Sequence, residues 1–307
     1  MADAFGIDRL FPADSSIFVV FFLFLCYKVL EKEVSVLKKF EGMLICTDLD
    51  GTLYRGDKTV SRENLEAIEY FKSEGGLFTF ITGRPPVIAV DICNTIHPNA
   101  PYGCFNGGGI YDPVGDEYLW SVELPEDVVE LVAEVDRRLP EMGIQYNTRS
   151  GVYFNKDNEA QAYFRSVTGL ENLYCHYAQM SEKAVKIIFA HMEDEQMDAV
   201  IELLNNHPRA AEFDFIRSER ILYEILPKGV SKGAVLRKMA ELLGIEMKNT
   251  VAVGDYNNDI SMVLAAGRGY AVENAIPELK AAADFITVSN ENHAIAKIIE
   301  DLDHLKA

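Results

Sequence analysis

The chain has 307 residues, 49% of them apolar and 10% aromatic, and a chain of this length and composition predicts a globular protein of about two domains. Acidic residues outnumber basic ones by 48 to 29, the net charge is −19, and no run of Lys and Arg exceeds two residues, which argues against a nucleic-acid-binding surface. The five cysteines are odd in number and form no CxxC pair. They argue against a disulfide framework or a zinc site and predict a reducing, cytoplasmic environment.

Residues 1–42 differ in character from the rest of the chain. Ile17–Tyr27 is an uninterrupted apolar run of 11 residues, which as a helix would cover roughly half of a hydrocarbon core about 30 Å thick. We consider three interpretations: a weak membrane anchor, an arm that docks on the protein, and a stretch upstream of a natural start at Met43. We favour the third, because Met43 lies one residue before the first predicted core strand.

The apolar stretch Leu44–Thr47 predicts a buried strand, and Asp48 and Asp50 follow it two residues apart. Side chains at this spacing point to the same side of an extended backbone. We therefore expect the two carboxylates at one spot, which requires a cation between them or a shared proton. Gly51 ends the strand in a turn. Since open α/β sheets bind their ligands at the carboxyl ends of strands, this stretch predicts a site for Mg²⁺ and phosphate.

Alternating helices and strands continue from this turn. Ser61 predicts the cap of a helix that ends near Glu74, and a strand over 77–81 leads into Thr82-Gly83-Arg84. A further strand over 102–105 precedes Asn106 and three glycines. The glycines fit either a loop around a phosphate or a tight turn, and we favour the turn because no GxGxxG spacing follows. This alternation is typical of a parallel sheet.

The pattern changes in residues 123–224. Helices are expected over 126–138, 159–167 and 193–205, and strands over 144–147, 152–155, 185–191, 212–217 and 221–226. Tight turns such as Arg149-Ser150-Gly151 join several of these strands, as in antiparallel sheets. We predict an inserted α+β cap domain here.

The parallel pattern resumes after the insert. Expected elements are a helix over 231–243, a strand over 250–253 that ends in Gly254-Asp255, and then, in order, a helix over 258–266, a strand over 269–272, a helix over 277–282, a strand over 284–287 and a helix from 292. The predicted fold class is therefore α/β: a doubly wound, mostly parallel sheet with a Rossmann-like core in residues 43–122 and 225–307, and the cap inserted between the two parts.

Groups suited to phosphoryl transfer stand at four strand or helix ends: Asp48 and Asp50, Thr82, Lys232, and Asp255 with Asn258 and Asp259. Such ends lie side by side in a doubly wound sheet. A carboxylate can act as nucleophile, others can hold Mg²⁺, and a hydroxyl, an amide and an ammonium can bind phosphate oxygens.

The order DLDGT, TGR, SKG and GDYNND resembles the haloacid dehalogenase superfamily. More narrowly, NGGGIYD, the insert and LPKGVSKGAVL are similar to the Cof-type sugar-phosphate phosphatases. The resemblance covers residues 43 to about 303 and implies a Mg²⁺-dependent phosphatase for small phosphate esters. It also implies that the insert is a cap over the site.

Residue by residue, the resemblance implies that Asp48 is the nucleophile and that Asp50 is first the acid and then the base. It implies that Mg²⁺ is held by the Asp48 carboxylate, the Asp50 main-chain carbonyl and Asp255, with Asp259 behind them. The phosphate oxygens would contact the Leu49 main chain, Thr82, Gly83, Lys232 and Asn258.

Two alternatives remain open at this stage. A phosphomutase would use the same chemistry, and a phospho-accepting signalling module also places aspartates, a Thr and a Lys at the ends of a parallel sheet. The module needs no cap, and turnover separates the two classes. The sequence predicts neither the physiological substrate nor the oligomeric state, and the possible membrane contact through residues 17–27 is the less favoured interpretation of that run.

Overall fold

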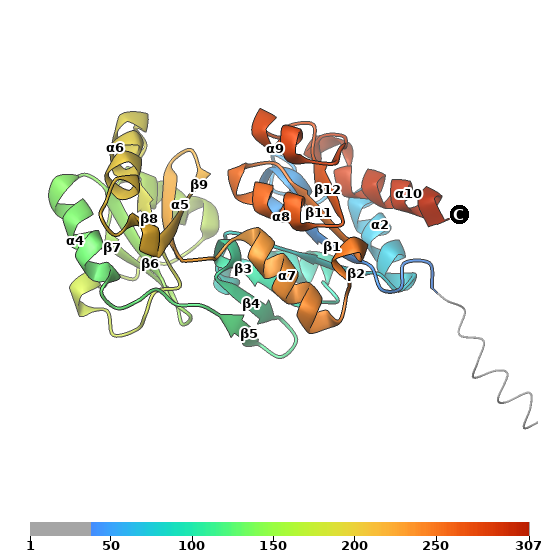
Figure 1. Ribbon diagram of the computed structural model, residues 1–307, viewed down its shortest axis with the longest axis horizontal. Helices are drawn as coiled ribbons and strands as arrows, with labels where there is room; N and C mark the ends of the chain where they lie inside the picture. The colour runs from blue at the N-terminus through green and yellow to red at the C-terminus, as the bar shows by residue number, and fades with distance from the viewer. Residues whose placement is uncertain (1–37, 307) are drawn as a thin grey trace, which may run out of the picture. The chain divides into compact units, whose positions relative to one another are not determined.

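The computed structural model describes residues 38–306, and most of its helices pack around a five-stranded parallel sheet, on the right in Figure 1. Its strand order is β13-β12-β11-β1-β2. The strands are β1 (Leu44–Thr47), β2 (Leu77–Phe80), β11 (Thr250–Gly254), β12 (Arg268–Ala271) and β13 (Phe285–Ile286). Because β1 pairs with β2 on one side and β11 on the other, the loop after β1 lies between the loops that follow those two strands.

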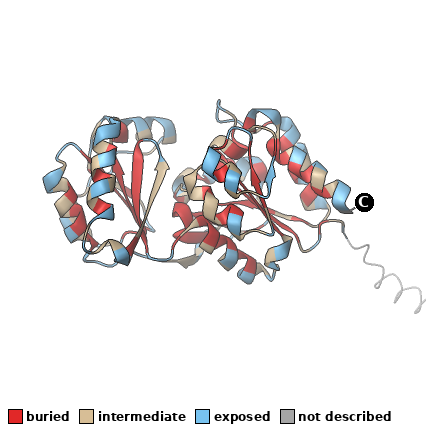
Figure 2. Ribbon diagram, turned by 45° about the horizontal axis from the view of Figure 1, so that its top comes forward, coloured by how far each residue is buried: buried red, intermediate tan, exposed pale blue. Residues whose placement is uncertain are grey.

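Helices cover both faces of this sheet, as a doubly wound fold requires. They are α2 (Arg62–Ser73), α3 (Val90–Ile96), α7 (Lys232–Leu243), α8 (Ile260–Ala265), α9 (Pro277–Ala282) and α10 (Ala294–Lys306). Ile45 and Val253 pack on one face with Phe71 of α2 and Ile298 of α10. Leu44, Cys46 and Ala252 pack on the other with side chains of α7 and α8. The strands β1 and β11 are accordingly buried throughout their length (Figure 2), whereas the edge strand β13 is exposed.

A small antiparallel sheet follows β2 in the chain. It consists of β3 (Tyr102–Cys104), β4 (Gly109–Asp112) and β5 (Glu117–Ser121), and a parallel bridge between Ile81 and Gly103 joins it to the end of β2. The predicted strand at 102–105 is thus present, but it pairs mainly with β4. β4 and β5 were not predicted, because the glycines 107–109 indicated only a turn.

The segment predicted as the cap contains a second five-stranded sheet, which is antiparallel and has the order β7-β6-β8-β10-β9. Its strands are β6 (Gly143–Asn147), β7 (Val152–Lys156), β8 (Lys186–Ala190), β9 (Phe213–Glu219) and β10 (Leu222–Pro227), and its helices are α4 (Val128–Arg138), α5 (Glu159–Thr168) and α6 (Asp194–Asn205). Side chains of α4 and α6 pack on Ile187 and Phe189. Ala160 of α5 packs on the opposite face, against Ile188 and Leu222.

The predicted fold class, a parallel α/β sheet with an inserted α+β segment, is confirmed. The predicted boundary at residue 224 falls inside β10, so that strand carries the chain from the antiparallel sheet toward α7. Within residues 38–306, no helix is both long enough and apolar enough to cross a membrane. The apolar run 17–27, with its three interpretations, lies outside the described residues.

Candidate active site

A cavity of about 870 Å³ lies over the carboxyl ends of β1, β2 and β11. Six of the nine residues that the sequence predicted for the site line it: Asp48, Asp50, Thr82, Gly83, Asp255 and Asn258. Lys232 and Asp259 are fully buried beside it, and the Leu49 side chain is part of the apolar core, so only its main chain is available to a ligand. The topology therefore brings together groups as far apart in the chain as Asp48 and Asp259, which are 211 residues apart.

The ammonium group of Lys232 joins two of the aspartates. Its Nζ donates to Asp48 Oδ1 at 2.5 Å and to Asp259 Oδ1 at 2.6 Å. Ser231 caps α7 by accepting from the Ala234 N–H, and this fixes Lys232 at the first position of the helix. Asp259 is held in turn by the N–H groups of Asp255 and Tyr256, which donate to its Oδ2 at 2.9 and 3.1 Å.

Three carboxylates gather around this ammonium. Asp48, Asp255 and Asp259 each place an oxygen within 4.8 Å of the other two. Thr52 Oγ1 donates to Asp255 Oδ1 at 2.9 Å. A Cβ on Gly51, whose φ is +82°, would lie 2.4 Å from Asp255 Oδ2, so the turn after β1 needs a glycine both for its backbone conformation and for this close approach.

The electrostatics of the triad favour a cation. Burial, and then repulsion from Asp259, raises the pKa of Asp255 to about 7. Burial and the same neighbour raise the pKa of Asp48 well above its ordinary value, against the lowering effect of Lys232. One ammonium thus does not balance three clustered carboxylates. A hard divalent cation with a preference for oxygen ligands, such as Mg²⁺, fits this donor set.

The carboxylate of Asp50 does not join this triad. It accepts from Arg84 Nε at 2.9 Å and Arg84 Nη2 at 2.7 Å, and from Lys58 Nζ at 2.8 Å. Burial alone would raise the pKa of Asp50, but the hydrogen bonds and charges of Arg84 and Lys58 hold it below its ordinary value. This differs from the expectation that the Asp48 and Asp50 carboxylates point to one spot, with a cation between them or a shared proton. The chain turns directly after Asp50, and a separate pair of basic side chains neutralises it.

Thr82, Gly83 and Asn258 lie around Asn106, which was not among the predicted site residues. Asn258 Nδ2 donates to Asn106 Oδ1 at 3.0 Å, and the Asn106 N–H donates to the Thr82 carbonyl at 3.0 Å. A Cβ on Gly83 would lie 2.9 Å from Asn106 Oδ1, so Gly83 leaves room for that amide. Asn106 stands two residues after β3 in the NGGG motif, and this position was the only sign of its role in the sequence.

Other residues at the cavity were also missed. Arg84 stands within the TGR motif, so its place could have been inferred, whereas Lys58 has no motif around it. Lys186 and Glu224 line the cavity from β8 and β10, and they come from strands whose pairing the sequence did not specify.

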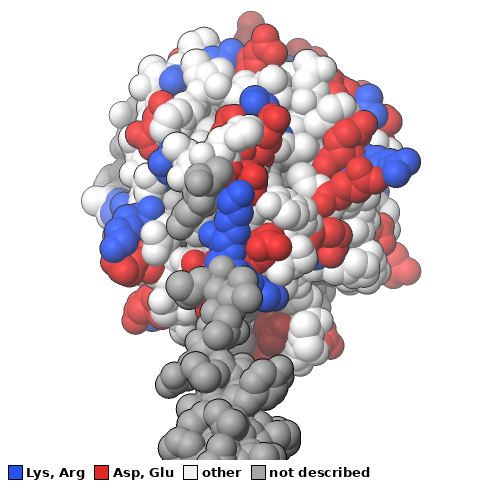
Figure 3. All heavy atoms as spheres, turned by 90° about the vertical axis from the view of Figure 1, so that its right-hand side faces the viewer, with Lys and Arg blue, Asp and Glu red and all other residues white. Residues whose placement is uncertain are grey.

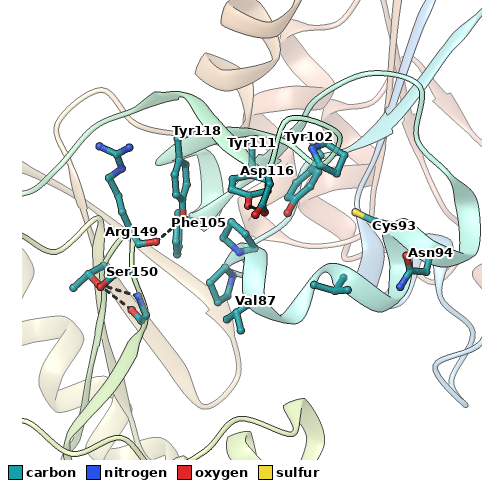
Figure 4. A pocket seen from close by; sticks show the side chains of 16 residues that line it. Val87, Cys93, Asn94, Tyr102, Phe105, Tyr111, Asp116, Tyr118, Arg149 and Ser150 are labelled. Carbon is teal, nitrogen blue, oxygen red and sulfur yellow. Dashed lines mark hydrogen bonds between the residues drawn. The ribbon is translucent and has the colours of Figure 1, made fainter.

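A second cavity, of about 510 Å³, lies beside the segment that leads into α3. Figure 4 shows Tyr102, Phe105, Tyr111 and Tyr118 along its wall, with Val87 and Cys93 on the other side. Tyr111 donates to Asp116, and the Tyr118 hydroxyl donates to the Arg149 carbonyl at 3.3 Å. None of the clustered aspartates lines it, so the phosphoryl-transfer groups belong to the first cavity.

The described surface carries mixed charge. On the face in Figure 3, acidic and basic side chains are interspersed, without a continuous basic surface among the coloured residues. This agrees with the net charge of −19 and with a small-molecule ligand.

Comparison with known proteins identifies the family. Residues 45–299 match the model of the haloacid dehalogenase-like hydrolases. The Bacillus subtilis protein YxeH is 30% identical over 268 residues, which is 84% of this chain and 97% of the relative. The 5-amino-6-(5-phospho-D-ribitylamino)uracil phosphatase YitU of the same bacterium is 26% identical over 268 residues, with 84% and 96% covered.

Solved structures share the fold. A haloacid dehalogenase-like hydrolase from Bacteroides thetaiotaomicron superposes with a TM-score of 0.74 at 25% identity, over 85% of this chain and 99% of the other. The subclass IIB sugar phosphatase BT4131 superposes with a TM-score of 0.75 at 21% identity, over 84% and 98%. The chain therefore belongs to the haloacid dehalogenase-like hydrolases, as its Cof-type motifs indicated, and it is a phosphatase of that family.

Proposed function

We propose that this protein is a Mg²⁺-dependent phosphatase that hydrolyses small phosphorylated metabolites through an aspartyl-phosphate on Asp48. The observation that carries the proposal is the cluster of Asp48, Asp255 and Asp259 at the carboxyl ends of β1 and β11, in which Lys232 donates to Asp48 and Asp259. Such a cluster offers a nucleophile and a cation site in one place.

In the first step, a carboxylate oxygen of Asp48 attacks phosphorus, and the bond between phosphorus and the ester oxygen breaks. Asp50 delivers a proton to that oxygen, so the leaving group departs as an alcohol. In the second step, Asp50 takes a proton from water, the resulting hydroxide attacks phosphorus, and Asp48 is released together with inorganic phosphate.

Asp50 requires a change of partners before it can act as an acid. Arg84 and Lys58 hold it in the ionised form by the contacts described above. An arriving phosphate dianion attracts the same two cations. We infer that the substrate draws them from Asp50, which raises the pKa of its carboxyl and allows it to carry the proton.

The phosphate oxygens have several neutral and positive donors at hand. We assign to them the Thr82 hydroxyl, the Gly83 N–H, the Leu49 main chain, the third N–H of Lys232 and the second N–H of Asn258. The Asp48 carboxylate, the Asp50 main-chain carbonyl and Asp255 would hold Mg²⁺, with Asp259 behind them. When bound, the cation neutralises charge on the transferred phosphoryl group.

We propose residues 123–224 as a cap that encloses the leaving group and excludes bulk water. Side chains from this segment line the same cavity as the aspartates: Asn147, Tyr163, Phe164, Lys186, Ser218 and Glu224. Polar and aromatic groups together suit a polyhydroxylated leaving group, in line with the sugar and ribitylamino compounds in the names of BT4131 and YitU. We propose a cytoplasmic location, where such metabolites occur.

Release of free phosphate tests the proposal. With Mg²⁺ and p-nitrophenyl phosphate, we expect many equivalents of inorganic phosphate per chain. A single, stable phosphate per chain would indicate a signalling module instead, and transfer to a second sugar phosphate without free phosphate would indicate a phosphomutase. A screen of phosphorylated sugars, nucleotides and cofactors would then identify the preferred ester.

A further inference from the structure

Lys186 and Glu224 form a buried ion pair on the antiparallel sheet. Lys186 Nζ lies 3.0 Å from Glu224 Oε2, and the two side chains are 3% and 2% exposed. The register pairs Glu224 with Ile188, so Lys186, two residues away, is its diagonal neighbour on the same face. On the same face Ile188 and Leu222 pack against α5, while Gln145, Asn147 and Ser218 add polar groups, and the Ser218 hydroxyl donates to Glu224 Oε1. An ion pair in such a place stabilises a fold little compared with apolar residues of similar size.

The two members of the pair bind the loops that follow β2 and β3. Lys186 Nζ donates to the carbonyl of Gly83 at 2.8 Å. Glu224 Oε2 accepts from Asn106 Nδ2 at 2.8 Å, and Asn106 Oδ1 accepts from Asn258 Nδ2 at 3.0 Å. Two polar routes thus connect the antiparallel sheet with Gly83 and Asn258, which we assigned to the phosphate.

The chemistry of these groups fixes the direction of each hydrogen bond. A carboxylate only accepts, so Glu224 requires the NH₂ group of Asn106 to face it. The oxygen of Asn106 then faces Asn258, which must donate to it and keeps one N–H for a phosphate oxygen. Asn106 has a left-handed backbone conformation, with φ of +57°, and such a conformation persists only where its surroundings hold it.

We propose that Glu224 and Lys186 are positioning residues that link docking of the antiparallel sheet to phosphate binding. Glu224 acts through Asn106 on Asn258, and Lys186 acts on the loop of Gly83. The inference rests on the proposed function of the same site. It means that the phosphate-binding groups reach their final positions only when the cap segment is docked on them.

The test compares phosphate binding in three variants. In the double variant Lys186→Met/Glu224→Leu, both polar routes are absent while buried volume is retained, so the protein should fold. Glu224→Gln keeps an acceptor oxygen but loses the charge. Lys156→Met is the matched control, because it breaks the ion pair of Lys156 with Asp136 within the same segment. The probe is inorganic phosphate in the presence of Mg²⁺, measured by calorimetry and as a competitive inhibitor of p-nitrophenyl phosphate hydrolysis.

We expect phosphate affinity to fall about tenfold in the double variant and less in Glu224→Gln, which corresponds to the loss of hydrogen bonds with a charged partner. KM should rise in parallel, and Lys156→Met should leave both unchanged. In an Asn106→Ala background, Glu224→Gln should have no further effect on phosphate affinity, since it acts through that amide.

Two results would overturn the inference. One is wild-type phosphate affinity in a folded double variant. The other is a loss of phosphate affinity on Glu224→Gln that is as large in the Asn106→Ala background as in the wild type. Calorimetric binding does not depend on turnover. A wild-type protein that binds phosphate but releases none from an ester would overturn the proposed function alone.

Discussion

The guanidinium of Arg84 donates two parallel hydrogen bonds to the carboxylate of Asp50, from Nε at 2.9 Å and from Nη2 at 2.7 Å. This bidentate arrangement, with Lys58 as a third donor, favours the ionised carboxylate. Asp255 lines the same cavity, but its pKa is shifted in the opposite direction, because burial and repulsion from Asp259 disfavour its ionised form. Replacement of each aspartate by asparagine should therefore change the stability of the folded protein in opposite directions.

Asp50→Asn should destabilise the metal-free protein at neutral pH. The pKa of Asp50 is lowered in the folded state, so its contribution is present above the unfolded value of about 3.9 and is lost as pH falls through the folded value. The effect should be modest, because about a third of the side chain, 33%, is exposed. Thermal unfolding from neutral to acidic pH measures it. A Tm deficit that persists unchanged in acid would contradict this explanation.

Asp255→Asn should instead raise the Tm of the metal-free protein at about pH 8, by about 2 °C or more. Here the folded pKa, about 7, lies above the unfolded one, so the folded state binds more protons and loses stability as pH rises from about 4 to 7. The gain in Tm should disappear toward pH 4, where the Asp255 carboxyl of the folded wild type is protonated and, like the amide that replaces it, uncharged. Added Mg²⁺ should stabilise the wild type and not the variant. A variant less stable than wild type at pH 8 without metal would show that Asp255 is not held under repulsion.

Gly51→Ala should weaken Mg²⁺ binding by about tenfold, as changes beside metal ligands generally do. The new methyl group would collide with Asp255 Oδ2, 2.4 Å away, and φ at this position is +82°. Gly169→Ala is the control, since φ there is +71° with no atom within 4 Å, so it carries the backbone strain alone. Both should lower the Tm, and only Gly51→Ala should change the Mg²⁺ dependence of turnover. Equal Mg²⁺ requirements in the two variants would mean that the close approach has no role in metal binding.

The parallel sheet and its strand ends could be predicted because local signals agree there. Ser61 caps α2 as predicted, the helix expected over 231–243 is present as α7, and the apolar runs at 44–47 and 250–253 are buried strands. The partners of Asp50 could not be predicted in the same way. Which cation neutralises a carboxylate depends on side-chain direction after a turn, and Gly51 reverses the chain just there.

Contacts between strands that are far apart in the chain also could not be predicted from the sequence. Asn106, Lys186 and Glu224 meet because β8 and β10 pair in one register and because the loop after β3 takes a left-handed conformation. Neither feature has a local sequence pattern that specifies it. The motifs thus predicted the residues of the parallel sheet, and the structure was needed for those that approach from the antiparallel one.

The central claim is that Asp48 is the nucleophile of a Mg²⁺-dependent phosphatase, and steady-state turnover of p-nitrophenyl phosphate by wild type and Asp48→Asn tests it most directly. The amide is a poor nucleophile, and the change removes one charge from the carboxylate cluster. We predict that the variant, shown to be folded by circular dichroism, loses turnover by a factor of about 10⁴ or more, while wild type turns over only with Mg²⁺. Turnover in Asp48→Asn within about tenfold of wild type would contradict the account.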